Sequence, residues 1–206
     1  MKFKLLVLAL FLSHLTYSQS VKDSLLKKDI VNLVEEMEFM YGYDQTLREY
    51  TIYKTFDKCE TNRIENLRDS LKMEELSNRQ FESDDVKKLI WEKYINPKDA
   101  EHTERMIEIT KKYGFPRVKR IRDYYKKEFI APEFNPLIIF VHSPKEYWEE
   151  LKGLMLNEYK QERINQCQYG YLLWHFTGRK SFKPMLDNGF EMVTENGKTQ
   201  LKSTCD

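Results

Sequence analysis

The stretch VKDSLLKKDIVNLVEEMEFM, residues 21–40, decides the fold because its apolar residues recur at helical spacing. Residues three or four positions apart share one face of an α-helix, and that face packs against a core. The residues in this series are Ile30, Leu33, Val34, Met37 and Met40. The stretch therefore predicts a long amphipathic helix at the start of the folded domain.

Helix signals continue along the chain and predict the later boundaries. Asp44 is expected to start a second helix, and Ser83 is expected to cap a helix that ends at Asn96-Pro97. Asn caps well and Pro fits the first turn, so the same pair is expected to open another helix. Gly114 follows that helix, as expected for the left-handed residue after a helix end.

The second half of the chain gives four further signals. Residues 116–129 predict a helix whose outer side is basic, with Arg117, Lys119, Arg120, Arg122, Lys126 and Lys127. The apolar run Leu137–Val141 fits either a buried strand or a buried helix, which periodicity does not separate. Ser143–Glu146 has the pattern of a capping box with Pro in the first turn. Asn196-Gly197 predicts the turn of a small hairpin.

The composition agrees with a mainly α fold. Charged residues make up 33% of the 206 residues and there are only seven Gly, which suits amphipathic helices better than a turn-dense β fold. We expect one multi-helix domain over residues 19–188. Residues 1–18 are expected to be a signal peptide, and residues 189–206 a hairpin or tail.

Residues 1–18 have the order of regions found in secretory signal peptides. A short basic start with Lys2 and Lys4 precedes the apolar run 5–12, and small residues precede Gln19. The run is too short for a membrane-spanning helix, which needs about 20 apolar residues. We therefore expect cleavage near Ser18 and a periplasmic or secreted protein without a transmembrane segment. The alternative is a buried N-terminal helix.

The net charge argues against a nucleic-acid partner. The chain is formally +1, and two of its lysines lie in the predicted signal peptide, which leaves −1 for the rest. A near-neutral chain has no global electrostatic attraction for nucleic acid. The basic side of residues 116–129 could contact an anionic membrane surface. A solvated face is the favoured interpretation, because Asp123 and Glu128 dilute the basic charge.

The three cysteines, Cys59, Cys167 and Cys205, allow a disulfide if the protein is exported. Their odd number leaves at least one thiol free or paired between chains. Two buried thiols and one thiol in the tail fit the sequence at least as well as a bridge. The spacing resembles no zinc pattern.

Three histidines of the mature chain are candidates for chemistry. His102, His142 and His175 each lie in or beside an apolar segment. Imidazole titrates near neutral pH, so two of them could act as general acid and base. Zinc is the weakest alternative, because their spacing lacks a short helical metal signature. The favoured interpretation gives each histidine a structural role in the core or at its rim.

Asp44 and Arg48 lie one helical turn apart, and the spacing allows two interpretations. They could form a surface ion pair, or Arg48 could point into a cleft and bind a carboxylate or phosphate. The chain has no Gly-rich phosphate loop, no serine in a nucleophile elbow and no Cys beside a His in the sequence. We therefore expect no cofactor and no metal.

Four short motifs follow one another along the chain: Asp44-Gln45 with Arg48, Asp99 with His102, Tyr113-Gly114-Phe115-Pro116, and Val141-His142. Their order resembles a bacterial, mainly helical family known only as a domain of unknown function. That family has Trp where Phe115 stands and Gln where Val141 stands, so the chain is similar to a divergent member. The resemblance implies a mostly α domain in which Asp44, Arg48, His102, Tyr113 and His142 converge. It implies no activity.

Two functions from different classes fit these residues. The first is an exported module that binds a small ligand, a glycan or a protein partner. Its candidate binding residues are Asp44, Arg48, Asp99, Tyr113, His175 and Arg179. We favour this function because it requires fewer specialised groups.

The second function is a hydrolase with His142 or His102 as the general base. Asp99 or Glu101 would orient the base, and Arg48 or Arg179 would steady an anion. Such an enzyme needs His142 within about 3 Å of an acidic partner, in a site that opens into a pocket. We also expect the two imidazoles to lie near each other.

Overall fold

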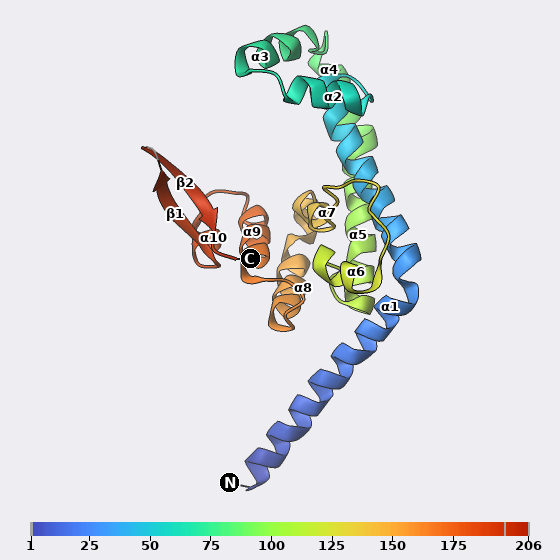
Figure 1. Ribbon diagram of the computed structural model, residues 1–206, viewed down its shortest axis with the longest axis vertical. Helices are drawn as coiled ribbons and strands as arrows, with labels where there is room; N and C mark the ends of the chain where they lie inside the picture. Colours follow the sequence, from blue (N-terminus) through green and yellow to red (C-terminus); the bar gives the residue numbers. More distant parts are fainter. Residues whose placement is uncertain (1, 196, 206) are drawn as a thin grey trace.

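A computed structural model describes the backbone of residues 2–195 and 197–205, and the side chains within these ranges from Val21 onward. It confirms the mainly helical fold (Figure 1). Within the described residues, the strands form only one two-stranded hairpin near the C-terminus. The side chains on which the signal-peptide prediction rests lie outside the described residues.

The first helix is longer than predicted. Helix α1 (Lys2–Tyr53) passes Met40 without a break, so the prediction of a second helix that begins at Asp44 is wrong. Asp44 is buried in mid-helix, where its carboxylate accepts hydrogen bonds from side chains instead of capping a helix end. Its polar partners come from elsewhere in the fold, and helical spacing does not show them.

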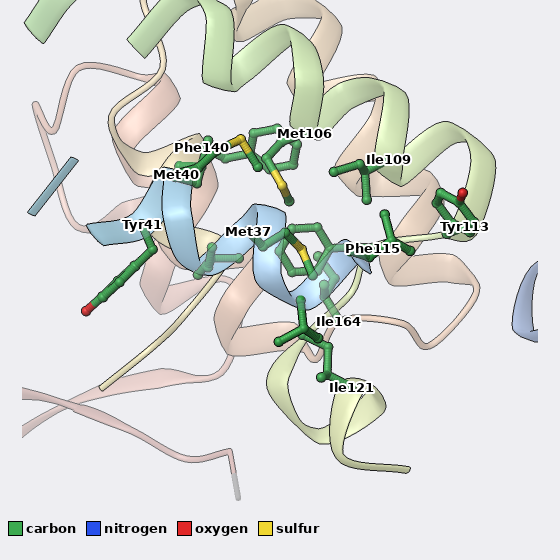
Figure 2. Close-up of a cluster of buried hydrophobic side chains, with 14 of the residues drawn as sticks. Met37, Met40, Tyr41, Met106, Ile109, Tyr113, Phe115, Ile121, Phe140 and Ile164 are labelled. Carbon is green, nitrogen blue, oxygen red and sulfur yellow. The ribbon is translucent and has the colours of Figure 1, made fainter. Parts of the chain in front are cut away.

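The core forms where α1 packs against α5 (Asn96–Tyr113) and α7 (Leu137–Val141). The predicted apolar face of α1 is buried, and its side chains meet Met106 and Ile109 of α5 (Figure 2). Phe140 enters the same cluster from α7, so the run left open between strand and helix is a helix. Its five residues lie between the turn at Pro136 and Ser143.

The helix that leads into α5 does not end where we expected. Ser83 caps α4 (Asp84–Ile90) by accepting from the N–H of Asp85, as predicted. A π-helical turn, Trp91–Ile95, then joins α4 to α5. Helix α5 begins at Asn96 with Pro97 in its first turn, as predicted, but Asn96 does not cap it and the chain stays helical through the junction. Pro97 has no N–H to donate, and its ring would crowd the carbonyl four residues earlier in a regular α-helix. The wider turn, closed by Asn96 N–H on Trp91 O, accommodates the proline.

The helix predicted over residues 116–129 is shorter, and its basic side is different. Only α6 (Val118–Tyr124) is helical. Arg120 is buried, which corrects its prediction as an outer residue. Its guanidinium donates to the backbone carbonyls of Tyr113, Gly114 and Phe115 and pairs with Asp23 of α1. A charged side chain can be buried when all of its donors are used in this way.

The capping box predicted at Ser143–Glu146 does not form. Ser143 Oγ instead donates to Phe140 O at the end of α7. A short 3-10 turn, Lys145–Tyr147, then leads into α8 (Trp148–Lys160). The serine therefore ends one helix and does not begin the next.

The remaining elements form two groups outside this core. Helices α2 (Lys58–Glu65) and α3 (Asp69–Asn78) gather with α4 near the end of α1 (Figure 1). At the other side, α9 (Gln166–Phe176) is followed by α10 (Lys183–Leu186) and the hairpin. None of the helices, as far as the chain is described, is both long enough and apolar enough to cross a membrane.

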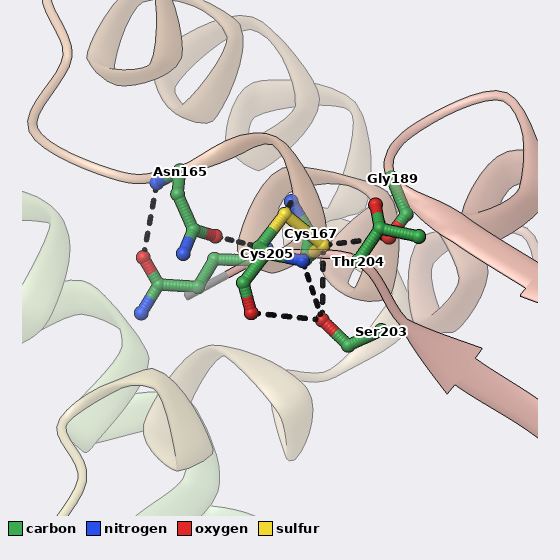
Figure 3. The surroundings of a disulfide bond; sticks show 7 residues. Asn165, Cys167, Gly189, Ser203, Thr204 and Cys205 are labelled. Atoms are coloured by element: carbon green, nitrogen blue, oxygen red, sulfur yellow. Dashed lines mark hydrogen bonds between the residues drawn. A yellow bond between two sulfur atoms is a disulfide. The ribbon is translucent and has the colours of Figure 1, made fainter.

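The hairpin pairs β1 (Phe190–Glu195) with β2 (Lys198–Ser203) in antiparallel register. Gly197 has a φ of 74°, as a tight turn requires. A disulfide between Cys167 at the start of α9 and Cys205 after β2 ties the hairpin to the helices (Figure 3). Cys59 is exposed and free.

Candidate functional site

Three elements bring the predicted polar residues together. Arg48 of α1 donates two hydrogen bonds from Nη2 to the Asp99 carboxylate of α5, at 2.8 and 2.9 Å. Its Nε lies 3.3 Å from the carboxylate of Asp44, one turn earlier on α1. The pairing arises because Asp99 lies in the first turn of α5 and α5 packs against α1. Asp44 and Arg48 do form an ion pair, but the pair is largely buried and not on the surface. Arg48 also binds a carboxylate, which is that of Asp99.

His142, just after α7, joins this network through Nδ1. The Nδ1 atom lies 2.9 Å from both carboxylate oxygens of Asp44 and 3.1 Å from Nε of Arg48. One nitrogen does not donate to Asp44 and accept from Arg48 at the same time. The charge-assisted bond to the buried carboxylate places the proton on Nδ1, and Arg48 Nε then pairs with Asp44. In this tautomer, Nε2 of His142 carries a lone pair.

The His142 ring is partly open, with 27% of its side chain exposed, whereas Asp44 is almost fully buried. Nε2 has no hydrogen-bond partner among the described side chains. A carboxylate that fixes one ring nitrogen while the other stays available is the arrangement in which His works as a base or as a ligand contact. The first geometric requirement of the hydrolase hypothesis is therefore met, with Asp44 in place of the predicted Asp99 or Glu101.

Arg48 is held on a further side by Trp91 of the π-helical turn. The guanidinium carbon lies 5.1 Å from the centre of the Trp91 ring, within the range of a cation–π contact. Its Nη1 is buried and has no hydrogen-bond partner in the part of the chain that is described. Burial raises the pKa of Asp99, and the charge of Arg48 opposes this rise.

His102 lies beside this network but not in an open pocket. Its ring packs edge-on against Tyr43, with 5.7 Å between ring centres. Burial lowers the pKa of His102, although the nearby Asp44 carboxylate opposes the change. The small space that His102 lines with Asp44 and Asp99 leaves no room for a water molecule. His102 therefore contributes packing at this position.

His175 lies at the C-terminal end of α9, which contacts α7. Its ring packs between Tyr171 and Trp174, at 4.7 and 4.9 Å between ring centres. Burial, together with the charges of Arg179 and His142, lowers the pKa of His175 to about 4. His142 and His175 are thus within electrostatic range of each other. Arg179 is exposed at the end of this segment, with a φ of 59°.

Tyr113 is not part of the network. Its hydroxyl donates to Asp29 of α1 at 2.7 Å. It lies 14 residues beyond Asp99 on α5, which corresponds to about 21 Å along the helix. The structure thus brings together Asp44, Arg48, Asp99 and His142, with His102 alongside, His175 nearby and Tyr113 elsewhere.

Sequence reasoning missed the aromatic side chains that frame these polar groups. The helical and capping patterns assign no functional role to Trp91, Tyr171 or Trp174. A signal was present for Trp174, because it adjoins the candidate His175 in the sequence. Trp91 carried no such signal, since the π-helical turn that directs it toward Arg48 is a tertiary feature.

Comparison with known proteins gives no relative: no family model, curated protein or solved structure matches the chain. Within the described residues, His, Cys, Asp and Glu side chains form no group of three that could hold a metal ion.

Proposed function

We propose that this protein is exported and binds a hydroxyl-rich ligand of the glycan class. The binding surface would be formed by His142 and the aromatic end of α9, with Tyr171, Trp174, His175 and Phe182. We call this group the His142 surface. One observation carries the proposal: an imidazole held by a buried carboxylate lies near a cluster of aromatic rings that are partly open to solvent.

The aromatic part of the His142 surface suits the apolar face of a sugar ring. The ring of Trp174 lies 5.9 Å from Tyr171 and 5.8 Å from Phe182, measured between centres. Phe182 is 47% exposed, and Tyr171 and Trp174 are half-buried. Ligand sites combine aromatic walls with a few fixed polar groups. The C–H face of a pyranose can stack on such rings, while its hydroxyls reach the polar groups.

The polar part of the surface can both accept and donate. In the tautomer fixed by Asp44, His142 Nε2 accepts a hydrogen bond from a hydroxyl. Trp174 Nε1 and His175 Nε2 are buried without a partner among the described residues. An unpaired buried polar atom costs about 1–3 kcal/mol, so a side-chain movement that lets either atom meet a ligand hydroxyl would recover free energy. Hydroxyls supply both roles at once, which favours a polyol over an anion.

Export is supported by two independent features. The N-terminal order of basic, apolar and small residues is that of a secretory signal peptide. The Cys167–Cys205 bridge is a bond that persists in oxidising compartments.

Titration with soluble oligosaccharides tests the proposal. Chitotetraose, cellotetraose and maltotetraose would be added separately while heat and Trp fluorescence are recorded. We expect at least one to bind saturably, and F182A to weaken that binding about tenfold, equal to about 1.4 kcal/mol. H142Q should weaken it as well, because the fixed acceptor is lost.

The matched control is F56A, which removes another exposed phenylalanine, near the start of α2. F56A should leave the affinity unchanged. The proposal is overturned if none of the three oligosaccharides binds the wild-type chain, or if F182A and F56A bind equally well.

A second function, hydrolysis with His142 as general base, is favoured by the 2.9 Å contact with Asp44. Asp44 would hold the ring and stabilise its protonated form, as the acid does in a catalytic dyad. Incubation of the same oligosaccharides, with product analysis, tests it. Cleavage that D44N and H142Q both abolish would make the protein an enzyme, and intact oligosaccharides after long incubation would argue against that role.

A further inference from the structure

We propose a second ligand site, for a phosphate- or sulfate-bearing small molecule. It is the depression between α6, residues 132–135 and the start of α9. The depression has a volume of about 360 Å³, which is within the range of small-ligand pockets. Asn165 and His175 stand at opposite ends of α9, about 15 Å apart along the helix. This site is therefore separate from the His142 surface. Its lining includes Arg117, Lys119, Asn135, Asn165 and Gln168.

The two cations of the depression have no acidic partner among the described residues. No ion pair or hydrogen bond involves the side chain of Arg117 or Lys119, and Nε of Arg117 is buried without a partner. Seven of the nine other arginines of the described chain pair with a carboxylate, as Arg120 does with Asp23. A buried guanidinium N–H that is left unpaired is costly, so Arg117 favours an incoming acceptor.

The three amides of the depression all use their oxygen in a hydrogen bond to the backbone. Asn165 Oδ1 accepts from the backbone N–H of Gln168, and Gln168 Oε1 accepts from the backbone N–H of Asn165 (Figure 3 shows Asn165). Asn135 Oδ1 accepts from the N–H of Leu137. Because a backbone N–H must meet an oxygen, these bonds fix which end of each amide is which. The NH₂ groups of all three are left without a partner in the described chain.

The result is a depression in which unpaired donors outnumber acceptors. A guanidinium, an ammonium and three amide NH₂ groups line one depression, and the N-terminus of the 11-residue helix α9 adds positive potential. Glu133 also lines it, but its carboxylate is 57% exposed and lies 4.0 Å from Lys58. An oxyanion with three or four acceptor oxygens matches this set. Val118, Pro132 and Phe134 provide an apolar wall for the rest of the ligand.

The test uses three probes with the full chain: inorganic phosphate, sulfate and glucose 6-phosphate. Binding is followed by calorimetry and by the NMR signal of the Arg117 Nε–H. We expect one saturable site, with a Kd of about 1 mM for phosphate. Glucose 6-phosphate should bind more tightly if the ligand is a phosphate ester of sugar size.

The variants N165D and Q168E separate binding from folding. Each keeps the oxygen that accepts the capping hydrogen bond, and Asp and Glu serve as well in these positions, so the midpoint of unfolding should stay the same. Each also replaces a donor with a negative charge, which should weaken phosphate binding at least tenfold. K127Q, which removes a basic charge outside the depression, is the matched control and should bind as the wild type does.

Two outcomes overturn the site. One is the absence of saturation by all three probes up to about 50 mM, which exceeds the Kd expected for such a donor set. The other is equal binding by N165D, Q168E and K127Q, which would show that any anion is held elsewhere. Loss of oligosaccharide binding would not affect this site, because the two proposals use different residues.

Discussion

At the scale of single residues, the polar network shows what sequence spacing can and cannot predict. Asp44 and Arg48 could be paired from their i,i+4 separation. Their junction with Asp99 and His142 depends on how three elements pack, and the two contacts span 51 and 94 residues of chain. His142 contacts both Arg48 and Asp44, while the expected closeness of His102 and His142 stays a prediction. The identity of the acid that orients His142 was predicted wrongly, because Asp44 was expected at a helix start and is in mid-helix.

His175 gives a pH-dependent prediction. Burial lowers its pKa from 6.5 to about 4 in the folded chain. Between these values the unfolded chain binds a proton and the folded chain does not, so the free energy of unfolding decreases as the pH falls from about 6.5 to about 4. Because the ring is only half-buried, we expect this loss to be about 1–2 kcal/mol.

Urea unfolding at about pH 7.5 and pH 4.5 measures this contribution, with H175Q as the reference. The wild type should lose more stability than H175Q over this interval. The other titrating groups, such as Asp99 and His102, remain in both proteins and cancel in the difference. Equal losses in the two proteins would contradict the pKa assigned to His175.

At the scale of elements, the turn after α5 depends on one glycine. Gly114 has a φ of 71°, and a Cβ there would lie 2.5 Å from Cδ and Nε of Arg163. Arg163 is buried and bonded to Glu158, so it has little freedom to move away. We expect G114A to lower the free energy of unfolding by about 2–4 kcal/mol. Chemical denaturation measures the loss.

Gly153 provides the matched control for this prediction. It lies in the middle of α8, is exposed, and a Cβ there would have nothing within 4 Å. G153A should therefore raise the free energy of unfolding by about 0.5–1 kcal/mol, because Ala has the better helix propensity. A loss of stability in G153A similar to that in G114A would contradict the explanation by steric contact.

The apolar pattern predicted most helices, but local cap signals predicted some boundaries wrongly. The buried face of α1 and the caps at Ser83 and Gly114 follow from side-chain chemistry within a few residues. Asn96 and Ser143 carry equally good cap patterns that the structure does not use. Tertiary packing decides between such signals. The buried face of α5 and Ile95 just before it hold the chain helical through Asn96, and the carbonyl of Phe140 at the end of α7 accepts from the Ser143 hydroxyl.

At the scale of the whole molecule, the disulfide links the start of α9 to the segment after β2. Cys167 and Cys205 are 38 residues apart, and bridging a loop of that length stabilises a chain by about 4 kcal/mol in the chain-entropy model. We expect C205S, or reduction of the wild type, to lower stability by up to this amount and to make the hairpin sensitive to proteases. Denaturation and limited proteolysis, with and without reductant, measure both effects.

C59S is the control for the disulfide, because Cys59 is exposed and free. It should behave as the wild type does in both measurements. A wild-type chain whose stability does not respond to reductant would contradict a role of the bridge in holding the hairpin. Sequence reasoning left this bridge open, since three cysteines allow several states and only the fold brings two of them together.

The π-helical turn Trp91–Ile95 sets the rotational phase between the helices that it joins. Successive residues of an α-helix are about 100° apart around its axis, so one additional residue in a turn rotates everything beyond it by that angle. Because α5 is packed on α1 and α4 has no buried residues, deletion of that residue would rotate α4 and Trp91 relative to α5. Insertion or deletion of a single codon here would therefore remove the Trp91 ring from Arg48 while Asp44, Arg48, Asp99 and His142 stay in place.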